Sequence, residues 1–176
     1  GDFLIQRSRI PQIVADAAYL ILKRPSFECT GNFFIDEEVL KENGVTDYAV
    51  GPIYTKTKKD IDDAFDYAKR VGVDPIVGIP IHDDLAYVAQ KTKEYNIRYA
   101  IHNHGPEDEL YPTAESIYTL IKDLDPRVGI CFDMGHNARA GHDSVADLQK
   151  YSKRIFDMHL KNITAATKTG TTCELG

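Results

Sequence analysis

The feature that most constrains this chain is an alternation of short apolar runs with amphipathic stretches, from about residue 48 onward. The apolar runs occupy 48–54, 75–80, 97–103, 128–133 and 155–160. Between the first two, over 58–71, Ile61, Phe65 and Ala68 recur at the spacing of one helical face, and the charged residues occupy the other face. Such repeats indicate βαβ units, so the sequence predicts an α/β fold with a mostly parallel sheet.

Metal-capable side chains stand at the end of three consecutive predicted strands. His102, Asp133 and His159 close the runs at 97–103, 128–133 and 155–160, and His104 and His136 follow shortly after two of them. Right-handed crossovers bring the carboxyl ends of parallel strands to one side of a sheet. We therefore expect these side chains to face a common mouth, where α/β folds place their chemistry.

The first 50 residues follow a different pattern. We predict a helix over 10–24, a strand over 30–36 and a short helix over 37–43, with a seam near 47–51. This part contains no histidine, so the candidate functional residues all come from the second part of the chain.

Composition excludes several classes of function. The net charge is −6 and no cluster of Lys and Arg interleaved with aromatic residues occurs, which argues against a nucleic-acid partner. No apolar run approaches the ~20 residues of a membrane helix, so no membrane partner is expected. Cys29, Cys131 and Cys173 are too few and too widely spaced for a disulfide framework or a zinc knuckle. These features predict a cytoplasmic, reducing location.

Four segments of the second part resemble the xylose isomerase-like TIM-barrel family, the sugar phosphate isomerases and epimerases. They are Gly51–Thr55, Ile101–Asp108, Gly129–His136 and Met158–Asn162. The resemblance implies a partial TIM-barrel-like fold over 51–176 that contains the middle and later strands. It also implies a divalent metal (Mn, Mg, Co or Zn) and proton transfer beside the carbonyl of a small sugar or sugar phosphate.

The resemblance assigns a role to each candidate residue. Asp133 and His159 match metal ligands of the family, and His102 stands where many relatives have a metal-binding glutamate. The implied metal set is His102, Asp133 and His159. The implied substrate-binding residues are His104 and His136, and the implied catalytic residues are Glu107, His136 and Lys161.

Departures from the family pattern weaken the functional prediction. A histidine replaces the glutamate at position 102, and the family's last metal glutamate has no counterpart in the sequence. We therefore predict the remnant of a metal-dependent isomerase or epimerase site, weak or inactive in this chain. The alternative is a catalytically silent chimeric or designed α/β scaffold.

Each candidate residue also has a simpler interpretation. His102 and His104 can satisfy backbone carbonyls in a loop, and His159 can be a core histidine. Asp133 can cap a helix or form a turn. The acidic run 107–109 is interpreted as a solvated loop. The convergence of several such groups at neighbouring strand ends favours a shared site over these separate explanations.

The first part resembles a different family, the hydroxysteroid dehydrogenase-like short-chain dehydrogenases. Ala15–Tyr19, Thr30–Leu40 and Gly44–Val50 carry this likeness to the C-terminal end of those enzymes. We interpret the chain as a chimera, engineered or de novo, that joins a dehydrogenase-like tail (1–50) to a partial barrel (51–176), packed as one domain. Exposed sheet edges of a partial barrel predict homo-oligomers.

Overall fold

The computed structural model describes residues 49–174 together with Lys23 and Glu42. The chain divides into two units, Gly1–Tyr48 and Ala49–Gly176, and the fold below is that of the second. Apart from Lys23 and Glu42, the elements predicted over 10–43 lie outside the described residues. The dehydrogenase-like segment and the packing as one domain therefore stay predictions.

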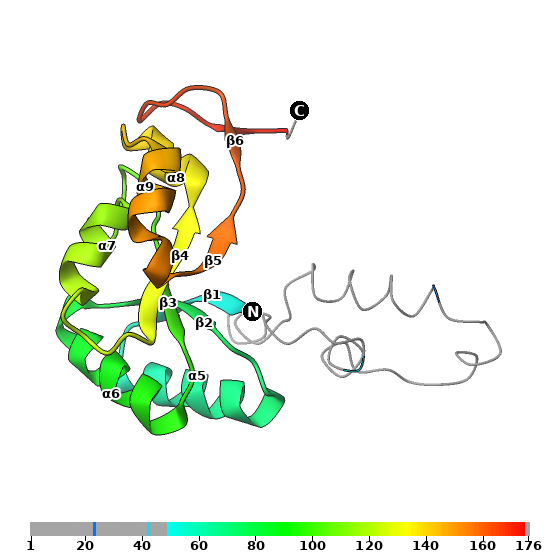
Figure 1. Cartoon of the computed structure of the whole chain (residues 1–176), viewed down its shortest axis with the longest axis vertical. Coiled ribbons are helices and arrows are strands. Elements are labelled where there is room, and N and C mark those ends of the chain that lie inside the picture. The colour runs from blue at the N-terminus through cyan, green and yellow to red at the C-terminus, as the bar shows by residue number, and fades with distance from the viewer. Residues whose placement is uncertain (1–22, 24–41, 43–48, 175–176) are drawn as a thin grey trace. The chain divides into compact units, whose positions relative to one another are not determined.

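Five parallel strands form one sheet in the order β1-β2-β3-β4-β5 (Figure 1). They are β1 (Val50–Thr55), β2 (Ile76–Pro80), β3 (Tyr99–His102), β4 (Val128–Asp133) and β5 (Ile155–His159). The helices are α5 (Lys58–Val71), α6 (Leu85–Tyr95), α7 (Ala114–Ile121), α8 (Met134–Arg139) and α9 (Ser144–Tyr151), with 3-10 turns η1 (His82–Asp84) and η2 (Ser152–Arg154). An antiparallel pair, β6 (Asn162–Ile163) and β7 (Thr172–Cys173), follows. The predicted α/β fold with a mostly parallel sheet is confirmed.

Local sequence signals explain why helix α5 has these ends. Thr57 accepts the Asp60 N–H while the Asp60 side chain accepts the Thr57 N–H, which is a capping box. Gly72 ends the helix in the left-handed conformation at φ 76°, which glycine adopts without a steric penalty. The predicted apolar face, Ile61, Phe65 and Ala68, is buried.

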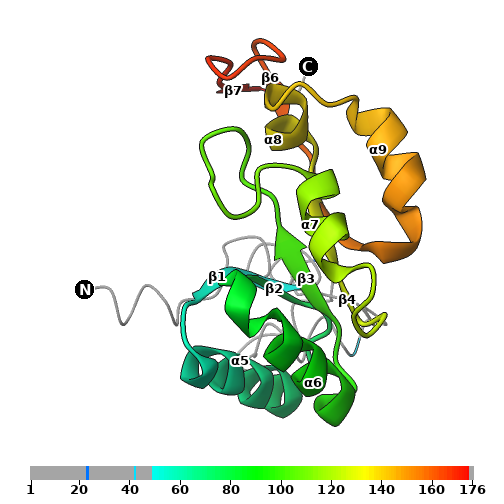
Figure 2. The same cartoon turned by 90° about the vertical axis from the view of Figure 1, so that its left-hand side faces the viewer.

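The two faces of the sheet have different surroundings. Alternate residues such as Tyr99, Ile101, Ile130 and Phe132 pack with α5, α6 and α7 in the main core, and these helices lie together on one side of the strands (Figures 1 and 2). The opposite face carries a smaller buried cluster of Val77, Ala100 and Cys131. Because side chains alternate along a strand, His102 and Asp133 share the face of Ala100 and Cys131.

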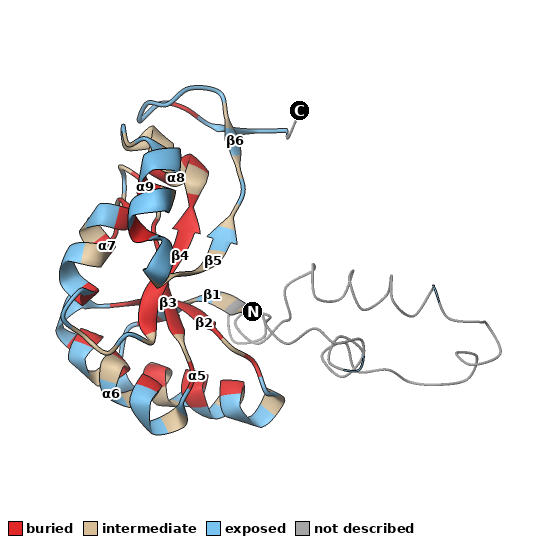
Figure 3. Ribbon diagram, in the orientation of Figure 1, coloured by how far each residue is buried: buried red, intermediate tan, exposed pale blue. Residues whose placement is uncertain are grey.

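Burial falls toward one edge of the described sheet. Every residue of β2, β3 and β4 is buried, whereas β5 is only partly buried along its length (Figure 3). Strands β1 and β5 are the edge strands among the described residues. None of the helices in this part of the chain combines the length and apolar character needed to span a bilayer.

Several short elements were not predicted from the sequence. Helix α8 starts directly after β4, where the sequence analysis allowed only a cap or turn at Asp133. Turn η1 precedes α6, and Asp84 at the start of α6 makes no side-chain capping hydrogen bond. The hairpin of β6 and β7 was also missed, because strands of two residues carry too few positions to show a period.

Candidate metal centre

Three neighbouring strands end on the residues that the sequence analysis singled out. His102 is the last residue of β3, Asp133 of β4 and His159 of β5. Asp133 is level with His159 in the register between β4 and β5, and His102 is level with Cys131 in the register between β3 and β4. The parallel pairing therefore delivers the three side chains to one edge of the sheet.

Four nitrogen atoms surround a single carboxylate oxygen, Asp133 Oδ2. His102 Nε2 lies 3.5 Å from it, His159 Nδ1 3.6 Å and His136 Nε2 3.9 Å. Lys161 Nζ lies 2.6 Å away and forms the closest ion pair. His102 Nε2 and His159 Nδ1 are 2.8 Å apart. We call these five residues the Asp133 cluster.

Asp133 uses its atoms for two separate tasks. Its Oδ1 accepts the backbone N–H of His136 at 2.9 Å and so caps α8, which makes the cap interpretation correct for this oxygen. Its backbone N–H and C=O are both paired with the side-chain amide of Asn103, at 2.8 and 3.0 Å. The carboxylate is thereby held rigidly, with Oδ2 directed into the cluster.

Two buried polar atoms of the cluster are not satisfied by ordinary hydrogen bonds. Within the described part of the chain, His102 Nδ1 makes none, and Asp133 Oδ2 has only its ion pair with Lys161 and the longer imidazole contacts, although their side chains are only 3% and 0% exposed. Buried polar atoms are nearly always hydrogen-bonded, and an unpaired one often marks a functional position. The arrangement is what a ligand or cation site requires.

Electrostatics prepares the cluster for a cation at neutral pH. Burial alone would raise the pKa of Asp133, but contacts with His102, His159, the His136 N–H and Lys161 outweigh it and lower the pKa below its ordinary value. Burial lowers the pKa of His102, and lowers that of His136 to about 4. The carboxylate is thus charged and these two imidazoles are neutral, which for His102 is the form that a metal ligand requires.

His104 lies beside the cluster and is oriented by Asp108. The two rings of His102 and His104 are 4.4 Å apart, and His104 Nδ1 is 3.1 Å from Asp108 Oδ2. Asp108 Oδ1 accepts the N–H groups of Leu110 and Tyr111 at 2.7 and 2.8 Å. Asp108 is therefore a positioned partner, and the interpretation of 107–109 as a solvated loop is wrong for this residue.

Glu107 and His136 are connected through Arg139. Glu107 forms a short ion pair with Arg139, whose Nη1 lies 3.4 Å from His136 Nδ1. The Glu107 side chain is 48% exposed. Glu107 therefore lies at the rim and is connected to the cluster only through Arg139 in the contacts of the described residues. Its predicted catalytic role stays a prediction.

Lys161 reaches the cluster because Gly135 leaves room for its backbone. A Cβ built at residue 135 would lie 2.8 Å from the Lys161 Cβ and 3.1 Å from Ile163 Cγ2, closer than packed carbons allow. The absence of a side chain at 135 lets the segment after β5 pass close to α8. Lys161 Nζ then contacts both Asp133 Oδ2 and His136 Nε2, the latter at 3.1 Å.

A second polar layer lies one step further down the strands. The Cys131 thiol donates to Asp157 Oδ2 at 3.1 Å, and Asp157 Oδ2 is 3.8 Å from His159 Nε2. Ligand atoms of Cys131, His102 and His159 all lie within 4.8 Å of one another. This layer was not predicted from the sequence, although Cys131 is also a buried residue of the smaller core cluster. The two-residue spacing of Cys131 from Asp133 and of Asp157 from His159 was the available signal.

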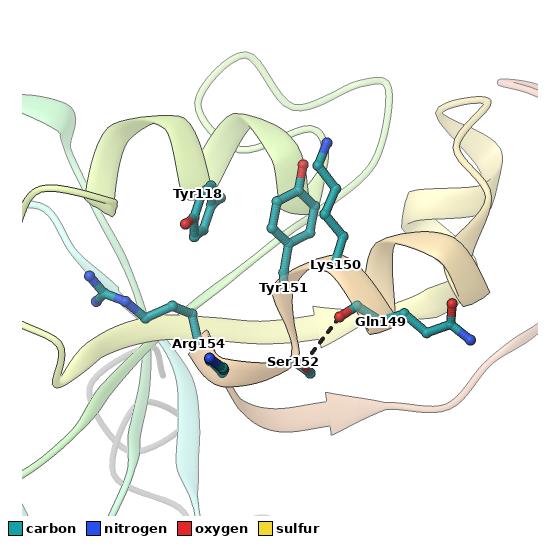
Figure 4. Close-up of a pocket in the computed structure, with 7 residues that line it drawn as sticks. Tyr118, Gln149, Lys150, Tyr151, Ser152 and Arg154 are labelled. Carbon is teal, nitrogen blue, oxygen red and sulfur yellow. Dashed lines mark hydrogen bonds between the residues drawn. The ribbon is translucent and has the colours of Figure 1, made fainter.

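A shallow hollow elsewhere is unrelated to this chemistry. It is lined by residues of α7, α9 and η2, among them Tyr118, Tyr151 and Arg154 (Figure 4). Arg154 points its guanidinium at backbone carbonyls such as Ile121 O and Val128 O, and so serves the fold. The hollow lies on the helical side and includes no residue of the Asp133 cluster.

The cluster fits a divalent cation. Ligand atoms about 2.1 Å from a zinc ion are separated by roughly 3.0 to 3.4 Å in octahedral or tetrahedral geometry. The separations of 3.5 and 3.6 Å from Asp133 Oδ2 to the two imidazoles, and of 2.8 Å between the imidazoles, lie close to that range. Small side-chain adjustments would let His102, Asp133 and His159 share one ion.

Curated relatives match only parts of the chain. Hydroxysteroid dehydrogenase-like protein 2 of Xenopus tropicalis is 51% identical over 55 residues, 30% of this chain and 13% of that protein. Rhizopine catabolism protein MocC of Rhizobium meliloti is 33% identical over 79 residues, which are 45% of this chain and 24% of that protein. A probable endonuclease 4 of Acholeplasma laidlawii is 36% identical over 80 residues (44% and 27%). The dehydrogenase match is short, and the chimera stays a prediction.

Solved structures match more of the chain. An uncharacterized protein from Parabacteroides distasonis ATCC 8503 is 29% identical with a TM-score of 0.57, covering 84% of this chain and 52% of its own. The IOLI protein with a zinc atom is 17% identical with a TM-score of 0.56, and the match covers 65% of this chain and 51% of that protein. The 3-keto-D-glucoside 4-epimerase YcjR of E. coli is 15% identical with a TM-score of 0.60, and the match covers 83% of this chain and 66% of that protein. The xylose isomerase-like TIM barrel family matches residues 50–173. The chain therefore belongs to the xylose isomerase-like TIM barrel family.

Proposed function

We propose that this chain carries the metal site of a sugar isomerase or epimerase, which moves a proton at the carbon next to a carbonyl. The observation that carries the proposal is the convergence of His102 Nε2 and His159 Nδ1 on Asp133 Oδ2, within 3.6 Å, from three different strands. Membership of the family supports this class of reaction, since solved relatives of the same fold include a 3-keto-D-glucoside 4-epimerase.

His102, Asp133 and His159 would hold the metal. A divalent cation bound there would polarise the substrate carbonyl and stabilise the negative charge that develops when the neighbouring proton leaves. The zinc atom of the IOLI neighbour supports a metal in this fold. The remaining coordination positions would be open to substrate oxygens or water, as in catalytic metal sites.

His104 is the best placed general base among the described residues. Asp108 Oδ2, 3.1 Å from Nδ1, favours the tautomer with a proton on Nδ1 and leaves Nε2 free to accept one. Hydrogen bonds from two backbone N–H groups fix Asp108 in turn. The predicted role of His104 in substrate binding thus becomes a proposed role in proton transfer.

His136 and Lys161 would bind the substrate on the other side of the metal. Lys161 Nζ and His136 Nε2 lie 3.1 Å apart and both contact Asp133 Oδ2. With a cation bound at Asp133, the Lys161 ammonium would be available to pair with a substrate hydroxyl or phosphate. Small sugars and sugar phosphates are therefore the proposed substrates.

Solvent exchange tests the proposal directly. The chain, loaded with Co²⁺ or Zn²⁺, is incubated with ketoses and their phosphates in D₂O, and deuterium at the carbon beside the carbonyl is followed by NMR. We expect exchange in the wild type and its loss in Asp133→Asn and His104→Gln. Metal binding without any exchange would instead favour the catalytically silent scaffold.

A further inference from the structure

We infer that the Asp133 cluster selects a borderline transition-metal ion of the Zn²⁺ or Co²⁺ class over Mg²⁺ or Mn²⁺. The inference rests on the proposed function, because it concerns the same His102, Asp133 and His159 side chains. It goes beyond that proposal by assigning the class of ion from the ligand atoms that these residues can offer.

The ligand set is rich in nitrogen. Two of the three converging atoms are imidazole nitrogens, His102 Nε2 and His159 Nδ1, only 2.8 Å apart. Imidazole suits Zn²⁺, Co²⁺ and Ni²⁺, whereas Mg²⁺ and Mn²⁺ favour sites built from carboxylates, carbonyls and water. His136 adds a third imidazole to the cluster, with its Nε2 3.9 Å from Asp133 Oδ2.

Oxygen ligands are scarce because the nearby carboxylates are already engaged. Asp133 commits Oδ1 to the His136 N–H, so only Oδ2 faces the cluster. Asp157 Oδ2 accepts from the Cys131 thiol. Asp108 is held by His104 and two backbone N–H groups. Among the described carboxylates, Asp133 Oδ2 is the oxygen that lies within 3.6 Å of both imidazoles, whereas a hard ion needs several oxygen ligands.

The sulfur of Cys131 lies near the same two histidines. Ligand atoms of Cys131, His102 and His159 fall within 4.8 Å of one another. A thiol has affinity for zinc-class ions and little for Mg²⁺. The layer below the cluster therefore shifts the preference in the same direction as the imidazoles.

The cluster is a built site and not a chance contact of surface groups. His102 and Asp133 are 3% and 0% exposed, and in the described chain His102 Nδ1 makes no hydrogen bond, while Lys161 Nζ is the close partner of Asp133 Oδ2 at 2.6 Å. Asn103 fixes the Asp133 backbone on both sides. Positions this rigid hold ligand atoms in place before an ion arrives, which favours a defined geometry.

Competition titration with a chromogenic chelator tests the inference on the full chain. Zn²⁺ and Mn²⁺ affinities are measured for wild type, for His102→Glu, which supplies a hard oxygen, and for His82→Glu, a matched exchange at an exposed histidine outside the cluster. Zn²⁺ binds more tightly than Mn²⁺ to most sites, so the informative quantity is the change in their affinity ratio. We expect the ratio to fall about tenfold or more in His102→Glu, ~1.4 kcal/mol, and to stay unchanged in His82→Glu.

Outcomes separate this inference from the proposed function. An unchanged or larger ratio of Zn²⁺ to Mn²⁺ affinity in His102→Glu overturns the ion preference. If the wild type binds metal and Asp133→Asn does not, the proposed metal site is still supported. No binding of either ion in the wild type refutes both. Zinc X-ray absorption of the wild type keeps the inference testable if His102→Glu does not fold. Two imidazole ligands with Zn–N distances of ~2.0–2.1 Å support the inference, and one imidazole ligand or none overturns it.

Discussion

Replacing Asp133 by Asn tests the role of the one charged oxygen at the centre of the cluster. Asn keeps a side-chain oxygen for the His136 N–H, so the cap of α8 is retained. It removes the negative charge that faces His102, His159 and Lys161. The substitution therefore separates the charge from the cap.

The expected magnitudes differ for the metal-free and the metal-loaded chain. Breaking a fully buried ion pair costs about 3–5 kcal/mol, but the Lys161 side chain is 29% exposed and can turn to water. We therefore expect a loss of about 1–2 kcal/mol without metal. At a free ion concentration of 100 times Kd, the wild type gains about 2.7 kcal/mol, or roughly 5–10 °C in Tm. The variant should lose this gain.

Thermal unfolding with and without Zn²⁺ or Co²⁺ measures both quantities. Asp143→Asn is the matched control, because exposed Asp143 caps α9 by accepting the Val145 N–H at 2.9 Å and lies outside the cluster. It should keep the metal-induced rise in Tm. The same rise in Asp133→Asn as in the wild type would refute the reasoning.

Three further perturbations probe the surroundings of the cluster. Lys161→Met should raise metal affinity about tenfold, since an ammonium 2.6 Å from Asp133 Oδ2 competes with the ion; calorimetry showing weaker binding would contradict this. Gly135→Ala should destabilise the chain by about 1–3 kcal/mol, because a Cβ would lie 2.8 Å from the Lys161 Cβ, and an unchanged Tm would argue against that packing. Burial lowers the pKa of His136 from about 6.5 in the unfolded chain to about 4 in the fold, so the unfolded state binds more protons between these values. The contribution of His136 to the free energy of unfolding is then fully present above pH ~6.5 and is lost as the pH falls toward ~4. Denaturant midpoints measured across this range should fall with pH, and His136→Gln should reduce that dependence.

The strands and their ends were predicted well from the sequence, because strands that are buried on both faces of a sheet appear in the sequence as continuous apolar runs. Helix α5 was predicted with its observed ends, since a capping box and Gly72 mark both of them. The five strands follow the predicted runs to within a few residues. Placing His102, Asp133 and His159 together needed only the rule that parallel strands end on one side.

What the sequence could not show depends on contacts distant along the chain. Helix α8 has six residues and no apolar period, and it exists because Asp133 caps it. Composition suggested that Asp108 is solvated, yet two backbone N–H groups and His104 engage it. The approach of Lys161 follows from the passage of its segment over Gly135, which no local pattern encodes.

The central claim is that side chains from three strands share one cation. Anomalous diffraction from crystals of the zinc-loaded chain tests it most directly. The account predicts one anomalous peak about 2.0–2.2 Å from His102 Nε2, Asp133 Oδ2 and His159 Nδ1 together. A peak bound elsewhere, or one that touches only one of these three residues, would contradict it.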